Sequence, residues 1–310
     1  MILAPMQGLT EVLFRRVYEE CFPHAIEKSV APFISLTKGN LGEACKKIGD
    51  VLPEANKHSI PVIPQILGKE PTEFVDMANR LYDLGYDEVN WNIGCPMRAI
   101  TGKHRGSGIL PYPDEVRGVL EAVMPNIKPK LSVKMRLGLK SKEEIYHIIP
   151  VLNSFELASV TIHPRTGQQQ YNGVPDRDAF GKVLPMIHAP VVYNGDINTV
   201  VDAAAIRNRF PQISDIMIGR GILYNPTLPL EIMGAIGSEA ERDELNRRFI
   251  VRLVDEIGRV IPTEQSRIRK TKEYWCLLWK ALPISENSAR EVLREEDYAT
   301  IIKMIYQHVQ

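Results

Sequence analysis

Short runs rich in β-branched apolar residues alternate with longer segments of helical periodicity along the first three quarters of the chain. This alternation is typical of parallel strands joined by crossover helices. Helices are expected, for example, over 73–84 and 114–123. The eight runs interpreted as strands are 2–4, 25–28, 62–65, 88–92, 131–135, 159–163, 191–194 and 215–219. Eight such units in about 235 residues predict a closed (β/α)8 TIM barrel of the α/β class.

The run at 25–28 is the least regular of the eight, because the surrounding AIEKSVAPFIS contains charges and a proline. After residue 227 the strand pattern stops, and helix-like segments follow, separated by Gly237, Pro262 and Pro283. We therefore predict a barrel domain over 1–235 and a small C-terminal helical bundle over 236–310. The two are expected to pack directly on each other, because no flexible linker separates them.

Composition excludes several classes of function. The 38 Lys and Arg balance the 38 Asp and Glu, so any attraction for a nucleic acid or a membrane surface must be local. The four cysteines form no CxxC pair, which argues against a zinc site and a disulfide framework. We expect no metal, no membrane segment and no secretory leader, and hence a cytoplasmic protein. Nothing implies a protein partner, so a monomer is expected.

Polar residues follow most of the predicted strands at the point where each strand ends. In barrels of this kind catalytic groups lie at the C-terminal ends of the strands. Each residue alone is explained by a turn, a helix cap or a solvated charge, but together they predict one shared site. The residues at these ends are Pro5, Met6, Gln7, Gln65, Asn92, Lys134, Arg136, His163, Arg165, Asn194, Gly195, Asp196, Gly219 and Arg220.

The seventh and eighth strand ends, YNGDI and MIGRG, combine exposed backbone N–H groups with the cation of Arg220. Barrels commonly bind phosphate at this place. Either glycine motif alone is explained by left-handed turn geometry. The two together favour a site for a phosphorylated ligand.

Lys134 ends the otherwise apolar strand LSVKM, where a cation would face either the barrel core, at high cost, or a bound anion at the mouth. His163 ends TIHPR beside Arg165, and either a structural histidine or a direct cofactor contact fits that place. Cys95 lies in a glycine-rich, basic loop, where a buried structural cysteine would be out of place. Because a free thiol titrates near about 8.5, Cys95 suits proton donation better than nucleophilic attack.

The motifs APMQGLT, NIGCP, KMRLG, HPRTGQQQY, NGDI and IGRG resemble those of the tRNA-dihydrouridine synthase family, in the family's order. The C-terminal RIRKTKEYWCLLWKAL is similar to the helical tRNA-binding domain of those enzymes. The resemblance implies a flavoprotein that reduces a flipped-out uridine of the tRNA D-loop, with NADPH as the electron donor and Cys95 as the proton donor. Asn92 and Arg165 would orient the uracil. FMN would be held by Pro5, Met6, Gln7, Gln65, Lys134, His163, Asn194, Gly195, Asp196, Gly219 and Arg220.

The segment 247–280 contains nine Lys and Arg against four Asp and Glu. We expect its cations Arg267, Arg269, Lys270 and Lys272 to bind tRNA, although such a run is often only a solvated helix face. Tyr274, Trp275 and Trp279 interleave with the cations and would either stack on nucleotides or form a bundle core. Two other functions stay open: a flavin barrel acting on a free pyrimidine, as in the dihydroorotate dehydrogenases, and a non-catalytic RNA-binding protein.

Overall fold

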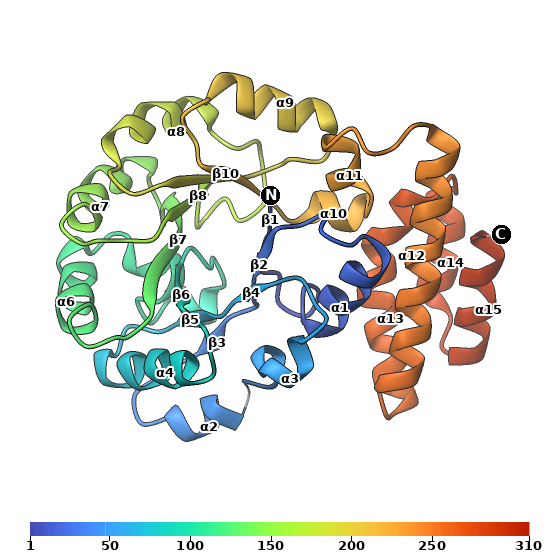
Figure 1. The fold of residues 1–310 in the computed structure, drawn as a ribbon, viewed down its shortest axis with the longest axis horizontal. Helices are drawn as coiled ribbons and strands as arrows, with labels where there is room; N and C mark the ends of the chain where they lie inside the picture. The colour runs from blue at the N-terminus through green and yellow to red at the C-terminus, as the bar shows by residue number, and fades with distance from the viewer. Residues whose placement is uncertain (47, 310) are drawn as a thin grey trace.

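The computed structural model describes residues 1–46 and 48–309. It contains a ring of parallel strands surrounded by helices, with a further group of helices on one side (Figure 1). The strands are β1 (Ile2–Leu3), β2 (Lys28–Val30), β3 (Ile34–Ser35), β4 (Val62–Ile63), β5 (Gln65–Leu67), β6 (Glu88–Ile93), β7 (Lys130–Gly138), β8 (Val160–Thr166), β9 (Val191–Asn194) and β10 (Asp215–Ile218).

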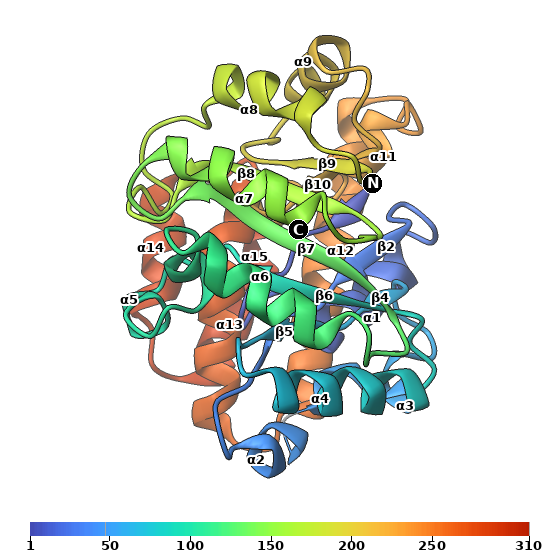
Figure 2. The ribbon, with the colours of Figure 1, turned by 90° about the vertical axis from the view of Figure 1, so that its left-hand side faces the viewer.

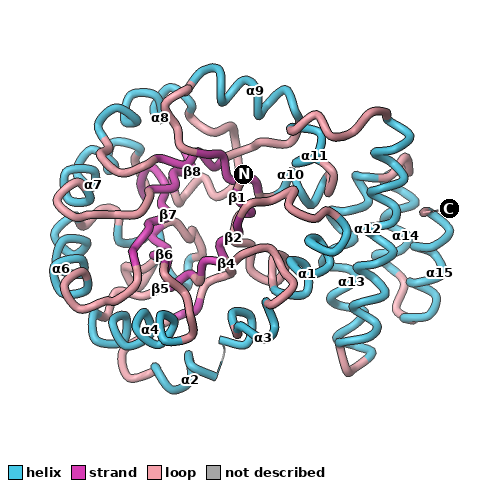
Figure 3. Tube along the Cα trace, viewed as in Figure 1, coloured by secondary structure: helices cyan, strands magenta, loops and turns pink. Residues whose placement is uncertain are grey.

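The ten short strands make eight barrel strands, because two of the eight are interrupted. The sheet order runs β3-β5-β6-β7-β8-β9-β10-β1-β2-β4. Pro32 lies in the gap between β2 and β3, and Pro64 separates β4 from β5. Proline has no N–H for the ladder, so both strands break at these points. Since β4 runs on into β5, the two ends of the order join and the barrel closes, as predicted (Figure 3).

The second strand lies later than the sequence predicted. Residues 25–28 were expected to be extended, but β2 covers Lys28–Val30 and β3 follows at Ile34–Ser35. Ala25 and Ile26 are buried, yet Ala25 closes a turn, in which its N–H donates to the Phe22 carbonyl at 3.2 Å, and Ile26 follows in a bend before β2. The apolar residues of the run at 25–28 therefore indicate that the segment is buried, and they do not indicate an extended strand.

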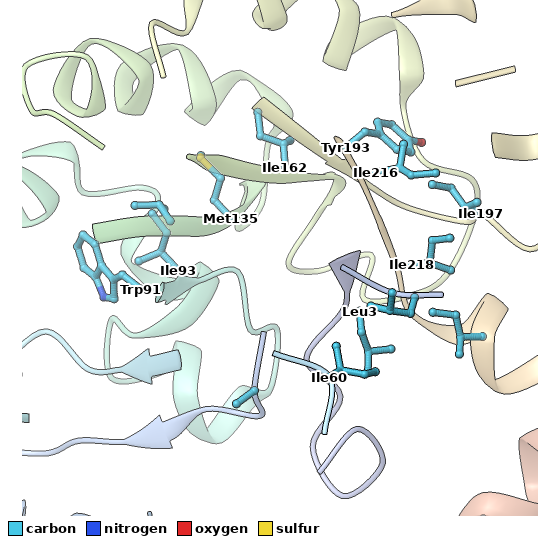
Figure 4. Packing of buried hydrophobic residues seen from close by; sticks show 14 of the residues in the cluster. Leu3, Ile60, Trp91, Ile93, Met135, Ile162, Tyr193, Ile197, Ile216 and Ile218 are labelled. Carbon is cyan, nitrogen blue, oxygen red and sulfur yellow. The ribbon is translucent and has the colours of Figure 1, made fainter. Parts of the chain in front are cut away.

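Alternate residues of each strand face opposite sides of the barrel wall. Leu3, Trp91, Met135 and Ile162 belong to a large core cluster that also holds the buried residues of the surrounding helices (Figure 4). A separate small cluster, Ile2, Ala4, Val30, Val192 and Met217, fills the interior on the side of β9, β10, β1 and β2. On the side of β5, β6 and β7 the interior positions are polar.

The crossover helices cover the outside of the barrel, with α4, α6 and α7 following one another around it (Figure 2). The helices up to residue 232 are α1 (Val12–Cys21), α2 (Leu41–Lys46), α3 (Pro53–Asn56), α4 (Pro71–Asp83), α5 (Arg98–Thr101), α6 (Pro113–Val123), α7 (Ile145–Leu152), α8 (Arg177–Val183), α9 (Val200–Arg209), α10 (Arg220–Tyr224) and α11 (Leu228–Ile232). The helices predicted at 73–84 and 114–123 correspond to α4 and α6.

Four helices form the C-terminal helical region: α12 (Glu239–Val260), α13 (Glu264–Leu278), α14 (Glu286–Arg294) and α15 (Tyr298–His308). Ser238, Thr263, Ser285 and Asp297 cap their N-termini through side-chain oxygens. Of the predicted breaks, Gly237 lies just before α12, Pro262 lies between α12 and α13, and Pro283 lies between α13 and α14. The predicted boundary at 235/236 lies between α11 and α12. No helix in the described part of the chain is long and apolar enough to cross a membrane.

Candidate active site

A cavity of about 400 Å³ opens at the C-terminal ends of the strands. Its wall combines the turn after β1, the loop after β6 and the ends of β7 to β10, and Leu277 of α13 also contributes. The structure thus brings together most of the residues that the sequence predicted. The predicted residues that line it are Pro5, Met6, Gln7, Asn92, Cys95, Lys134, His163, Asn194, Gly195, Asp196, Gly219 and Arg220.

Polar side chains from β5, β6 and β7 form a hydrogen-bonded layer beneath the cavity. The Gln65 amide donates to Asn90 at 2.7 Å, and Asn90 donates to the Ser132 hydroxyl at 2.9 Å. Asn92, one step nearer the cavity, donates to the Gln65 Oε1 at 2.8 Å. Gln65 is fully buried and does not line the cavity. Gln65 orients Asn92, and its predicted contact with the cofactor stays a prediction.

Lys134 points a cation into this site without an anionic partner among the described residues. Its strand register places it beside Asn92 on one side and Thr161 on the other. Burial, helped by the neighbouring Arg136 guanidinium, lowers the pKa of Lys134 to about 7. A buried ammonium is costly unless an opposite charge compensates it. The site therefore favours a ligand that carries or develops negative charge.

The opposite part of the wall is suited to an anion. Asp196 has φ +41° and accepts hydrogen bonds from Arg165 and Arg220. Burial raises the pKa of Asp196, but these two guanidinium groups outweigh it and hold the pKa below its ordinary value. The backbone is closely packed at Gly195, where a Cβ would lie 3.3 Å from the rings of two prolines. Helix α10 has only five residues, so the attraction for an anion comes from the cations more than from a helix dipole.

His163 lines the cavity as a neutral imidazole. Burial, together with the charges of Arg136, Lys134, Arg165 and Arg220, lowers its pKa well below the ordinary value. The Arg165 Nη1 lies 3.0 Å from the His163 Nε2. Since a guanidinium only donates, Nε2 must accept and the ring proton lies on Nδ1. His163 therefore offers a hydrogen-bond donor at Nδ1.

Hydrogen bonds hold the backbone of Cys95 on both sides of the residue, at its N–H and at its carbonyl. The Asn92 Oδ1 accepts from the N–H groups of Gly94 and Cys95, at 3.1 and 2.9 Å. The Cys95 carbonyl accepts from the N–H and the hydroxyl of Ser107, at 2.9 and 3.1 Å. Burial raises the pKa of the Cys95 thiol, against the opposing influence of Arg136 and Lys134. Cys95 is therefore held as a protonated thiol in the cavity wall at neutral pH.

Arg136 and Tyr171 also line the cavity, although the sequence analysis had assigned neither to a particular ligand. Arg136 donates from Nε to the Gly94 carbonyl at 3.0 Å, and it lies 5.6 Å from the Tyr171 ring centroid. Tyr171 is half-exposed at the mouth, with the Arg220 guanidinium 4.7 Å from its centroid. Arg136 was recognisable as a strand-end cation in KMRLG. Tyr171 gave no periodic signal, because it follows the strand by five residues in a turn.

Comparison with known proteins identifies the relatives of this chain. The sequence profile of the family described as "Dihydrouridine synthase (Dus)" matches residues 2–275. The chain belongs to the dihydrouridine synthase family. It is 27% identical to a probable tRNA-dihydrouridine synthase of Rhodobacter capsulatus, over 78% of this chain and 73% of that protein. It is 28% identical to tRNA-dihydrouridine synthase B of Pasteurella multocida, over 74% and 67%. It is 25% identical to tRNA-dihydrouridine(16) synthase of Pseudomonas putida, over 98% and 95%.

Two residues that the family resemblance placed against the uracil have protein partners here. The Asn92 Oδ1 accepts from the Cys95 loop, and its Nδ2 donates one of its two protons to Gln65. Arg165 is 1% exposed and does not line the cavity. It pairs with Asp196 and donates to the Gly173 carbonyl at 2.6 Å. Arg136 lines the cavity, and because its Nε and Nη1 donate to the carbonyls of Gly94, Thr166 and Gln170, its Nη2 is the group left to reach a ligand. The predicted contacts of Asn92 and Arg165 with the uracil stay predictions.

The four cations predicted to bind tRNA differ in their surroundings. Arg269 is exposed, with a side chain 73% accessible, and Lys272 is half-buried. Arg267 donates to the Ile261 carbonyl at 2.6 Å. Lys270 is only 17% exposed and donates to the Gly8 carbonyl at 2.8 Å, so it is turned toward the barrel. Backbone carbonyls thus engage Arg267 and Lys270, and the predicted contact of the four cations with tRNA stays a prediction.

The aromatic residues of α13 belong to the core of the helical region. Tyr274 and Trp275 are 2% and 1% exposed, and they donate to the carbonyls of Leu9 and Ala289. Trp279 packs against the same core cluster. Of the two alternatives left by the sequence, the structure therefore supports the bundle core for Tyr274 and Trp275.

Proposed function

We propose that the chain is an FMN-dependent tRNA-dihydrouridine synthase that reduces a D-loop uridine to 5,6-dihydrouridine, with NADPH as the electron donor. The family and the names of its relatives support the reaction class. The observation that carries the proposal is the convergence of three groups in one cavity: the protonated Cys95 thiol, Lys134, which has no anionic partner within residues 1–46 and 48–309, and the cationic wall around Arg220.

The residues present fit FMN. A volume of about 400 Å³ lies in the usual range of ligand cavities, roughly 300–1,000 Å³. The backbone of Gly195 and Gly219, with the Arg220 guanidinium, would hold the phosphate. The turn at Pro5, Met6 and Gln7 and the Nδ1 of His163 would contact the ring system. Lys134 would stabilise negative charge on it, which explains an otherwise costly buried cation.

The chemistry divides between the cofactor and the protein. Bound FMN would supply a hydride to C6 of the uracil. Cys95 holds a proton at Sγ and donates it to C5, so that one hydride and one proton together saturate the C5–C6 bond. Asn92 keeps the Cys95 loop in place through its Oδ1. Arg136 and Tyr171 bind and orient the uracil at the mouth of the cavity.

A uridine within folded tRNA must leave its stack to reach this cavity, at a cost of a few kcal/mol. Phosphate contacts elsewhere must offset that cost, and Arg269 and Lys272 on α13 are proposed to provide them. The Pseudomonas putida relative, which is named for position 16, matches 98% of this chain. The segment RIRKTKEYW favours the same subclass. Uridine 16 is therefore the first position to test.

The test is reduction of unmodified tRNA transcript by the purified protein with NADPH, with dihydrouridine mapped by mass spectrometry. We expect about one non-covalent FMN per chain and one modified position. The same assay with free uridine or orotate is the control, and no product is expected from it. A colourless protein would contradict flavin chemistry, and reduction of the free pyrimidine alone would contradict the RNA substrate.

A further inference from the structure

Lys270 of α13 is directed at the barrel and not at solvent. Its Nζ donates to the Gly8 carbonyl at 2.8 Å and lies 3.2 Å from a carboxylate oxygen of Glu11 and of Glu273. Its side chain is 17% exposed. The three protons of the ammonium thus match three acceptors, which fixes the side chain in one geometry.

The acceptor carbonyl of Gly8 belongs to the turn that builds one wall of the cavity. Gly8 has φ +79°, a conformation that side chains rarely adopt. The Met6 carbonyl accepts from the N–H groups of Leu9 and Thr10, both at 3.0 Å. Met6 and Leu9 themselves line the cavity. The conformation of this turn therefore sets the shape of the wall.

A second bond ties α13 to the same turn. The Tyr274 hydroxyl donates to the Leu9 carbonyl at 2.8 Å, and its ring stacks on Phe14 with centroids 6.0 Å apart. Two successive carbonyls, those of Gly8 and Leu9, are thus held by residues one helical turn apart on α13. Leu277, three residues further along, reaches the cavity itself.

We propose that Lys270 is a positioning residue for the cofactor: it holds the turn 5–10 in the conformation that binds FMN, so that the helical region completes the cofactor site. The proposal rests on the proposed function for the identity of the ligand. Lys270 would then act on the part of the cavity wall that contacts FMN, and its neighbours Arg269 and Lys272 would bind RNA. A charged donor is required, because a neutral side chain would leave Glu11 without its cation and Glu273 with only Arg269, at 3.9 Å, beside the Gly8 carbonyl.

The experiment compares Lys270→Met with Arg269→Met, which removes the same charge from the adjacent, exposed position. The flavin is removed and FMN is titrated back, with its fluorescence quenching as the readout. We expect Lys270→Met to weaken FMN binding roughly 10- to 100-fold, as for the loss of a charge-assisted hydrogen bond. Arg269→Met should bind FMN like the wild type. Lys270→Arg, which keeps the charge and the donors, should recover most of the affinity.

A second measurement tests the turn without any flavin. Amide hydrogen exchange of residues 6–10 in the flavin-free protein should be faster in Lys270→Met than in Arg269→Met, with exchange in β7 unchanged. If Lys270→Met does not fold, Tyr274→Phe removes only the bond to Leu9 and should shift both readouts in the same direction. Wild-type FMN affinity and exchange in Lys270→Met, with loss of RNA binding alone, would overturn the proposal. A wild-type protein that binds no FMN would instead overturn the proposed function, and the exchange data would still decide whether Lys270 holds the turn.

Discussion

The Cys95 backbone N–H donates a hydrogen bond of 2.9 Å to the side-chain oxygen of Asn92. Asn92 lies on β6, which is fixed in the barrel by β5 and β7, whereas Cys95 lies in the loop beyond it. The same oxygen also accepts from the Gly94 N–H, and the Asn92 amide nitrogen is held in turn by Gln65. The sheet therefore fixes the position of Cys95, the proposed proton donor, through Asn92.

Asn92→Ala should displace Cys95, while the protein still binds flavin. Two loop N–H groups lose their acceptor, and we expect stability to fall by about 1–3 kcal/mol. Reduction of the flavin by NADPH should be unchanged, while its reoxidation by tRNA should slow. Ser107→Ala is the matched control, because the Cys95 carbonyl keeps its bond to the Ser107 N–H. An equal loss in both half-reactions of Asn92→Ala would contradict the anchoring role.

Cys95→Ala should separate the two half-reactions. Flavin content and NADPH-driven bleaching need no thiol and should stay near wild type. Reoxidation of the reduced flavin by tRNA should slow by roughly 10²–10⁴-fold, the usual cost of losing a general acid. Rapid mixing with flavin absorbance follows each step. Unchanged reoxidation would exclude Cys95 as the essential acid, and joint loss of flavin and fold would mean a structural role.

Lys134 should make anion binding depend on pH. Burial and Arg136 lower its pKa to about 7, so at about pH 8 it is mainly neutral in the unliganded protein. An anionic ligand raises that pKa, and binding should take up nearly one proton. Calorimetry in buffers of different ionisation heat measures this uptake, which Lys134→Met should abolish together with much of the affinity.

The same residue should affect stability. Its folded-state pKa lies below its unfolded-state value of about 10.4, so the unfolded chain binds the extra proton between these pH values. The contribution of Lys134 to stability should therefore fall as pH decreases from about 10 toward 7. Flavin-free Lys134→Met should lose this dependence and unfold at a higher temperature than the wild type at neutral pH. If Lys134→Met kept the pH dependence of wild-type stability, the Lys134 ammonium would be solvated in the folded protein and the prediction would be wrong.

Charge reversal of Arg269 and Lys272 should weaken tRNA binding and flatten its salt dependence. Each lost phosphate contact removes about 0.7–0.9 units from the slope of the logarithm of affinity against the logarithm of salt concentration. Flavin reduction should be unaffected. Arg294→Glu with Lys303→Glu, at exposed positions of α14 and α15, carries the same change in net charge. Equal effects of the two pairs would mean that the attraction is nonspecific.

The alternation of short apolar runs and helical segments was enough to predict the barrel. It also predicted the helical region, because Gly237, Pro262 and Pro283 are strong local breaks that act without tertiary context. The second strand was misplaced, because Ala25 and Ile26 are buried in a bend that precedes the paired residues. Burial without strand pairing leaves the same apolar signature as a strand, and only the partner strand distinguishes the two.

The cavity residues were predictable because parallel strands end at one rim, which makes sequence position a guide to location. Side-chain direction was not predictable in the same way. Gln65 lies one layer below the rim, and Arg165 turns toward Asp196. Lys270 differs from Arg269 by one helical position, yet that single step of rotation separates an inward from an exposed cation.

Leu277 lies in the cavity wall although it belongs to the helical region. A barrel of this kind that exchanged its C-terminal helices by recombination would lose part of its own cavity at the same moment. Substitutions in the helical region can therefore reshape the cavity from outside the barrel. Outward positions of α13, such as Arg269, are free of that constraint, because their side chains do not line the cavity.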